Sequence, residues 1–255
     1  MRFASLGSGS KGNALLIQSG STRVLLDCGF GLSEVTARLW RLGVAPEDLD
    51  AILVTHEHED HGGGVPRLAS RHDLPVYLTH GTLAALGVER SAVPSAILID
   101  TMTPFAIGAI EVRPYAVPHD AREPVQFVLS DGAVRLGVLT DTGRLTPHIA
   151  RSLSGVDALM LECNHDLDLL WNGPYPASLK NRVAGRMGHL ANDAAAELLR
   201  AIDCGRLQHL IAAHLSETNN APHLARAALA GALNCEESWI GIATQDEGFA
   251  WREIL

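Results

Sequence analysis

The sequence is poor in cysteine. It has four cysteines among 255 residues, and Cys28, Cys163, Cys204 and Cys235 lie far apart with no C-x-x-C pair. Zinc ribbons and disulfide-stapled scaffolds both need closely spaced or paired cysteines. The pattern therefore excludes both classes and predicts small, buried thiols.

Long hydrophobic runs are also missing. The longest apolar stretches, at residues 51–54 and 158–161, are far shorter than the roughly 20 residues that a membrane helix needs. The first residues run into a glycine loop without an extended apolar segment or a cleavage site of the kind that a secretory signal carries. We therefore expect a cytoplasmic protein with no membrane partner.

Basic residues are outnumbered. Lysine and arginine total 20 against 29 acidic residues, which gives a formal net charge of −9. Such a surface repels nucleic acid as a whole, although a local group of arginines can still hold phosphates. A hydrophobic share of 47% with 19% charged residues excludes a disordered chain. Because no Pro/Gly/Ser-rich linker interrupts it, residues 1–255 are predicted to form a single domain.

Short β-branched or alternating runs fill the first half, and longer helical patterns fill the second. Such a mixture predicts an α/β protein with two packed sheets and helices outside. Ser33 and Asn192 are expected to cap or start their helices. Strands are predicted at 2–6, 14–18, 23–27, 51–55, 76–79, 110–116, 125–130, 134–139, 207–213 and 239–243, and helices at 33–42, 177–187, 192–202 and 222–233.

A glycine motif, G-x-G-x-x-G, occupies residues 7–12 after the first predicted strand. In a dinucleotide-binding fold this motif opens a helix whose N-terminus holds the pyrophosphate. Here a hairpin and a second strand are predicted to follow, and no Lys-Ser/Thr pair follows Gly12 as a Walker A loop requires. We interpret the motif as a glycine loop at the rim of a site.

Histidines carry the strongest signal. The run Thr55-His-Glu-His-Glu-Asp-His61 follows an apolar strand and offers His56, His58, Asp60 and His61 as metal ligands. Imidazole and carboxylate are ligands for zinc, manganese or iron. His56 and His58 can grip one ion, and Asp60 and His61 then face a neighbouring position.

This H-x-H-x-D-H pattern resembles the metallo-β-lactamase fold superfamily, whose fold is a four-layer αββα sandwich. The resemblance implies three further ligands, each after a strand: His119, Asp141 as the bridging carboxylate, and His214. His56, His58 and His119 would hold one ion, and Asp60, His61 and His214 the other. Asp27 matches an early aspartate of the family, which we expect to orient a ligand.

Three segments narrow the resemblance to the YycJ/WalJ-like group, bacterial proteins regarded as 5′-to-3′ DNA exonucleases. They are residues 6–14, 164–166 and 214–220. A fourth segment, at 188–192, looks like the histidine motif of tRNA-processing nucleases. It implies that His189 acts on the scissile phosphate, although His189 can equally be a helix-start residue. Asn13 and His165 are candidates for substrate contact.

The resemblance implies a phosphodiesterase acting on DNA with two divalent ions, Zn or Mn. Two ions bridged by Asp141 would lower the pKa of a bridging water, so that hydroxide attacks phosphorus. Asp60 would both ligate and orient the attacking oxygen, and His189 would protonate the leaving oxygen. The same hydroxide could serve a glyoxalase-II-like thioesterase or a lactonase. A redox or sensor module is disfavoured because His58 and His61 are present and no flavin domain is evident.

Overall fold

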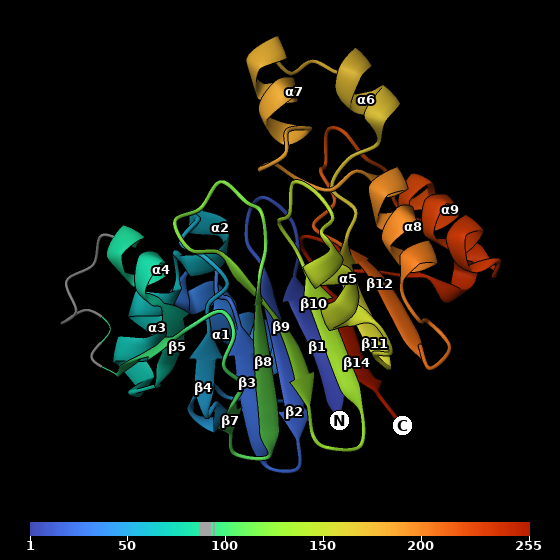
Figure 1. Cartoon of the computed structure of the whole chain (residues 1–255). Coiled ribbons are helices and arrows are strands. Elements are labelled where there is room, and N and C mark those ends of the chain that lie inside the picture. Colours follow the sequence, from blue (N-terminus) through green and yellow to red (C-terminus); the bar gives the residue numbers. More distant parts are fainter. Residues whose placement is uncertain (87–92, 94) are drawn as a thin grey trace.

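The computed structural model describes residues 1–86, 93 and 95–255 and arranges them in two mixed β-sheets (Figure 1). The first sheet has the strand order β14 (Phe249–Glu253), β1 (Arg2–Gly7), β2 (Ala14–Ser19), β3 (Thr22–Leu26), β4 (Ala51–Leu53), β5 (Val76–Thr79), β6 (Ala96–Ile99). The second has the order β13 (Gly241–Ile242), β12 (His209–Ala213), β11 (Ala158–Glu162), β10 (Arg135–Leu139), β9 (Val125–Ser130), β8 (Ile110–Ala116), β7 (Phe105–Ile107).

The main core lies between the sheets. Successive side chains of a strand point to opposite faces, so in β2 Leu15 and Ile17 join this core while Ala14 and Leu16 pack outward against helices. From the second sheet, β9 contributes the fully buried Phe127. Both faces of β2 are therefore apolar, which explains why this strand is a continuous hydrophobic run without alternation.

Helices cover the outer face of each sheet (Figure 1). On the first sheet, α1 (Leu32–Arg41) and α3 (Val65–His72) bury an apolar stripe. On the second, α5 (Pro147–Leu153), α8 (Asn192–Ala201) and α9 (Pro222–Leu233) do the same. The predicted four-layer αββα sandwich is confirmed. In the part of the chain that the structure describes, no helix is both long and apolar enough to cross a membrane.

Several predicted elements have the observed bounds, among them the strands at 76–79, 110–116 and 125–130 and the helix at 222–233. Ser33 was wrong as a cap, because α1 begins at Leu32 with Gly31 as its N-cap. Asn192 is the first residue of α8, but Ala191 is the N-cap. The helix predicted at 177–187 ends earlier, as α7 (Ala177–Val183).

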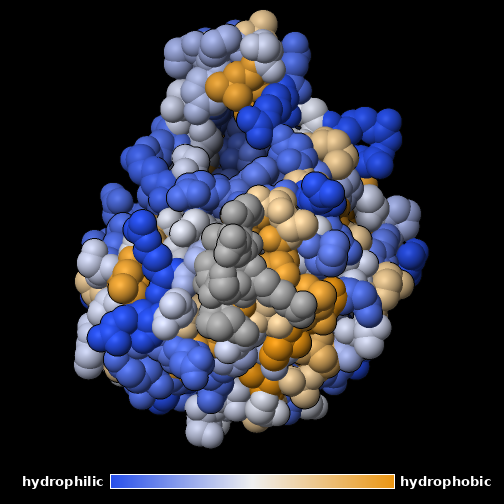
Figure 2. All heavy atoms as spheres, turned by 90° about the vertical axis from the view of Figure 1, so that its left-hand side faces the viewer, coloured by the Kyte–Doolittle hydropathy of each residue, from blue (hydrophilic) through white to orange (hydrophobic). Residues whose placement is uncertain are grey.

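A short helical arm interrupts the second sheet's outer layer. Between β11 and α8 the chain forms α6 (Leu167–Asn172) and α7, which stand above the sandwich (Figure 1). Figure 2 shows this arm projecting over the body, with hydrophilic residues around the recess beneath it. On the first sheet's side, α2 (Glu59–Gly62) and α4 (His80–Ala85) complete this end of the molecule.

Candidate active site

The predicted site residues meet at one edge of the two sheets. β3 and β4 run parallel, as do β10, β11 and β12, so their carboxyl ends lie together. β8 is antiparallel to β9, which is antiparallel to β10, and therefore ends at the same edge. The segments after β4, β8, β10 and β12 carry His56, His119, Asp141 and His214, respectively. Strand topology thus brings residues 158 positions apart in the sequence to one place.

Three of these strand ends use a left-handed backbone. Asp27, Asp141 and His214 have φ values of 60°, 51° and 54°. Non-glycine residues seldom adopt this region, and strained positions of this kind cluster at functional sites. Each residue leaves its strand abruptly, which turns its side chain toward the other site residues.

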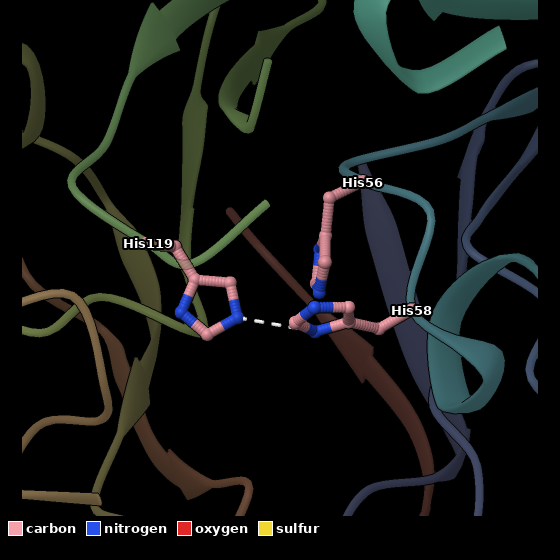
Figure 3. Close-up of side chains that lie close together, drawn as sticks. All are labelled: His56, His58 and His119. Atoms are coloured by element: carbon pink, nitrogen blue, oxygen red, sulfur yellow. Dashed lines mark hydrogen bonds between the residues drawn. The ribbon is translucent and has the colours of Figure 1, made fainter. Parts of the chain in front are cut away.

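His56, His58 and His119 form the first group of ligand candidates. Their rings point toward one another from the segments after β4 and β8 (Figure 3), with His119 Nε2 at 3.3 Å from His58 Nδ1. His56 Nε2 is buried and lacks a hydrogen-bond partner among the described residues. A buried nitrogen without a partner lowers the stability of the folded protein. A divalent cation bound by this nitrogen would remove that cost, so the three histidines fit a metal site.

Asp60, His61 and His214 form the second group. His61 Nδ1 contacts the buried Asp27 Oδ2 at 2.8 Å, and Asp27 also accepts from the backbone and hydroxyl of Thr55 at 2.8 Å. This bond fixes the His61 ring with Nε2 facing the group. Asp27 therefore orients a candidate ligand, as expected, in the way that carboxylates support metal-binding histidines.

Asp141 lies between the two groups. Its Oδ2 is 2.7 Å from His61 Nε2, and its Oδ1 is 3.3 Å from His214 Nδ1. It is also close enough to His56 and His61 to share an ion with them. Asp141 is 2% exposed, so its charge acts on both groups with little screening. This placement suits a bridging carboxylate.

The charges of the histidines differ between the groups. Burial lowers the pKa of His56 well below its usual range and also lowers that of His119, so both rings favour the neutral form that binds metals. Burial would likewise lower the pKa of His61, but Asp141 and Asp27 outweigh it and raise that pKa well above its usual range. The second group thus concentrates negative charge.

Glu162, which sequence reasoning missed, belongs to the site. It is fully buried at the end of β11; Oε1 is 2.9 Å from His189 Nδ1 and Oε2 accepts from the Thr142 amide at 2.8 Å. His189 Nδ1 is also 3.0 Å from Asp141 Oδ1. The available signal was a single acid directly after the apolar run 158–161.

Asn13 and His165 lie behind the site's surface. Asn13 is 5% exposed; its amide donates to Gly9 O at 2.9 Å and to Asp60 O at 3.2 Å, while Oδ1 accepts from Gly9 N at 2.9 Å. His165 is 1% exposed, and burial lowers its pKa to about 4. Asn13 therefore ties the glycine loop to the segment that carries Asp60, and Ser10 of that loop lines the cavity at its rim.

A cavity of about 390 Å³ opens above these residues. Its floor carries His58, Asp60, Asp141, His189 and His214, and its opposite wall comes from the α6–α7 arm and the segment after β12. Pockets of small ligands range from about 300 to 1,000 Å³. The site is therefore an open pocket of modest size, lined by metal-ligand candidates.

The β-lactamase superfamily domain matches residues 22–214 of the chain. The chain belongs to this superfamily. It is 33% identical to the exodeoxyribonuclease YycJ of Bacillus anthracis over 95% of this chain and 92% of that protein. It is 31% identical to the exodeoxyribonuclease WalJ of Streptococcus pneumoniae over 94% of this chain and 91% of that one.

A similar solved structure is the metallo-β-lactamase fold protein YhfI of Bacillus subtilis, with a TM-score of 0.77, 19% identity and 99% of both chains covered. These findings confirm the resemblance to the metallo-β-lactamase fold and to the YycJ/WalJ-like group. These matches identify the chain as a metal-dependent hydrolase. Its histidine and carboxylate groups fit the binding of divalent metal.

Proposed function

We propose that this protein is a dinuclear metal-dependent phosphodiesterase that degrades DNA from an end, in the 5′-to-3′ direction. The observation that carries the proposal is the 33% identity to an exodeoxyribonuclease over 95% of the chain, in a chain whose ligand candidates form two adjoining groups. The alternative, a thioesterase or lactonase, uses the same kind of site and is an outcome of the test below.

Two ions, zinc or manganese, fit the two groups. His56, His58 and His119 would hold one, Asp60, His61 and His214 the other, and Asp141 would touch both. Mixed imidazole and carboxylate ligands suit either metal. When bound, such a pair supplies the positive charge that holds a phosphate and activates water.

The chain's own residues then position the reaction. Asp60 lines the cavity, and its Oδ2 lies 3.4 Å from His214 Nε2, so it can accept a hydrogen bond from the attacking water. His189 also lines the cavity. Its Nδ1 is engaged by Glu162 and Asp141, which leaves Nε2 as the atom that donates a proton to the leaving oxygen.

The size of the cavity supports action at an end. At about 390 Å³ it lies near the lower limit of small-ligand pockets, and the α6–α7 arm covers one side of it (Figure 2). A free strand end enters such a recess more easily than an internal duplex segment does. We therefore favour exonuclease over endonuclease activity.

Linear and covalently closed circular DNA of one sequence, incubated side by side with manganese-loaded protein, test the proposal. Linear DNA should shorten while the circle stays largely intact, and a strand labelled at its 5′ end should release the label first. Equal cutting of both forms would establish an endonuclease. Absence of cutting together with rapid thioester or lactone hydrolysis would establish the alternative.

A further inference from the structure

One wall of the cavity has no part in the chemistry proposed above. It consists of Tyr175 and Leu179 from the arm, and Ser216 and Asn219 from the segment between β12 and α9. None of these side chains belongs to a group of ligand candidates in the part of the chain that the structure describes. The wall therefore needs another explanation.

We propose that this wall binds the base and sugar of one nucleotide at the end of a single DNA strand, with the base against Tyr175. The proposal rests on the nuclease function above and adds a specific recognition site to it. The phosphate of that nucleotide would lie on the opposite side of the cavity, near Asp60, His189 and His214.

The chemistry of the wall fits a base. Tyr175 and Leu179 are half-buried and line the cavity, so they offer apolar surface without being sealed in the core. Every base has a π-face, so an aromatic side chain binds single strands with little sequence preference. Stacking on Tyr175 would explain why a half-buried tyrosine lines the cavity beside the reaction centre.

Asn219 supplies an independent observation. Its side chain lines the cavity and is 1% exposed, and its Oδ1 has no hydrogen-bond partner among the described residues. Its Nδ2 makes only a long contact of 3.4 Å with Ser216 Oγ. A buried amide oxygen without a donor costs free energy. The oxygen lies beside Gly173, where a Cβ would be 3.0 Å from it, so the amide would turn toward the cavity to accept a hydrogen bond from the base or the sugar.

The arm also limits what can enter. Arg182 of α7 donates to Asp120 at 2.7 Å, and Asp120 follows His119 after β8. This contact ties the arm to the far side of the metal-ligand candidates. Because the recess holds about 390 Å³, its size suits one nucleotide better than a base pair. The geometry points to single-stranded ends as the substrate.

Calorimetric titration of manganese-loaded protein with deoxyadenosine 5′-monophosphate and, separately, with inorganic phosphate tests the site without turnover. Tyr175→Ala should weaken binding of the nucleotide by roughly 5- to 150-fold, the range of base–aromatic stacking, and that of phosphate by less than twofold. Tyr175→Phe should restore nucleotide binding. Trp171→Ala removes an exposed aromatic of the same arm that does not line the cavity, and should change neither affinity.

Any other result would contradict the proposed base-binding site. Normal nucleotide binding by Tyr175→Ala, equal weakening of nucleotide and phosphate, or an equal effect of Trp171→Ala would each remove Tyr175 from recognition. Failure of the nuclease function has a different signature: the wild-type protein would bind the nucleotide through Tyr175 and yet leave linear DNA intact.

Discussion

His189 touches two buried carboxylates with the same ring nitrogen. Glu162 Oε1 and Asp141 Oδ1 lie 2.9 and 3.0 Å from Nδ1. A protonated Nδ1 can donate to both, and two negative neighbours favour a ring that keeps its proton. The pair thus fixes which nitrogen faces the carboxylates and leaves Nε2 for the cavity. A histidine held in this way is suited to proton transfer through Nε2.

His189→Ala should therefore lower kcat by about a hundredfold to ten-thousandfold, the contribution of a positioned acid or base, and leave bound metal unchanged. The loss should shrink on a nitrophenyl phosphodiester, whose leaving group needs little protonation. Metal analysis and rates on both substrates check this. Loss of metal, or equal loss of rate on both substrates, would point to a structural role.

Asp141 is expected to matter for metal content itself. Protein purified without chelator should contain about two divalent ions per chain, and Asp141→Ala should lose at least one of them and nearly all activity. Asp141→Asn is a useful second variant, because asparagine tolerates the left-handed backbone at this position. Elemental analysis measures the stoichiometry. The exposed Asp193→Ala is the control, and a fully active, metal-free Asp141 variant would contradict the dinuclear site.

Residue-level prediction was most direct where the ligand candidates are neighbours in the sequence. His56, His58, Asp60 and His61 lie within six residues, so their chemistry could be recognised directly. His119 and the other distant candidates required a family pattern, because only strand topology brings them together. Glu162 was missed for the same physical reason: its partner, His189, lies 27 residues away, and a lone acid after an apolar run has no distinctive pattern.

At the scale of elements, the edge where the strands end is held by backbone contacts. The segment that carries Asp60 and His61 packs against the segments before β2 and after β3: the backbone N–H of Asn13 donates to Asp60 O at 2.8 Å, and the backbone N–H of Cys28 donates to His61 O at 2.7 Å. Because the two backbones approach so closely, the residues at this junction must have no side chain or a small one. Gly29 is the tightest point there, since a Cβ on it would lie 2.0 Å from Asp60 O.

Gly29→Ala should consequently displace the loop, destabilise the protein by about 1–3 kcal/mol, as overpacking does, and weaken metal retention. Thermal unfolding and metal content after dialysis against chelator provide the measurements. Gly31→Ala is a matched control two residues away, because a Cβ there meets nothing within 4 Å and φ is an ordinary −61°; as a change at the N-cap of α1 it should lose about 0.5–1 kcal/mol of stability and no metal. Equal effects of the two substitutions would contradict the close approach.

Strands with a paired strand on both sides were the easiest to predict. The strands at 110–116 and 125–130 pair with each other and keep their predicted bounds. β6 and β7, the outermost strands of their sheets, were missed; both contain exposed residues, and their short, mixed patterns do not distinguish a strand from a loop. Asn192 was right as the first residue of α8, whereas α1 begins one residue before Ser33; glycine and alanine occupy the cap positions of these two helices, and neither has a side chain that marks a cap in the sequence.

At the scale of the whole molecule, the protein and its proposed DNA substrate both carry a negative net charge. A net charge of −9 cannot steer DNA toward the protein from a distance, so affinity must come from the site itself. Two basic groups near the cavity are already engaged: Arg182 bonds Asp120 at 2.7 Å, and Lys11 bonds Glu217 at 2.7 Å. Binding should therefore involve few phosphates beyond the one at the reaction centre.

A site with few phosphate contacts predicts a shallow salt dependence of DNA binding. For single strands, log K falls with log salt at about −0.7 per phosphate neutralised; with about two such contacts, affinity should fall only about sevenfold between 50 and 200 mM salt. Fluorescence anisotropy of a labelled single strand with the slowly cleaving His189→Ala variant measures the slope. Lys11→Ala, at the rim and paired with Glu217, serves as a matched charge variant and should leave the slope nearly unchanged. A fall of a thousandfold or more would instead require an extended basic surface of about six to ten contacts, and recognition would then lie outside the cavity beneath the arm.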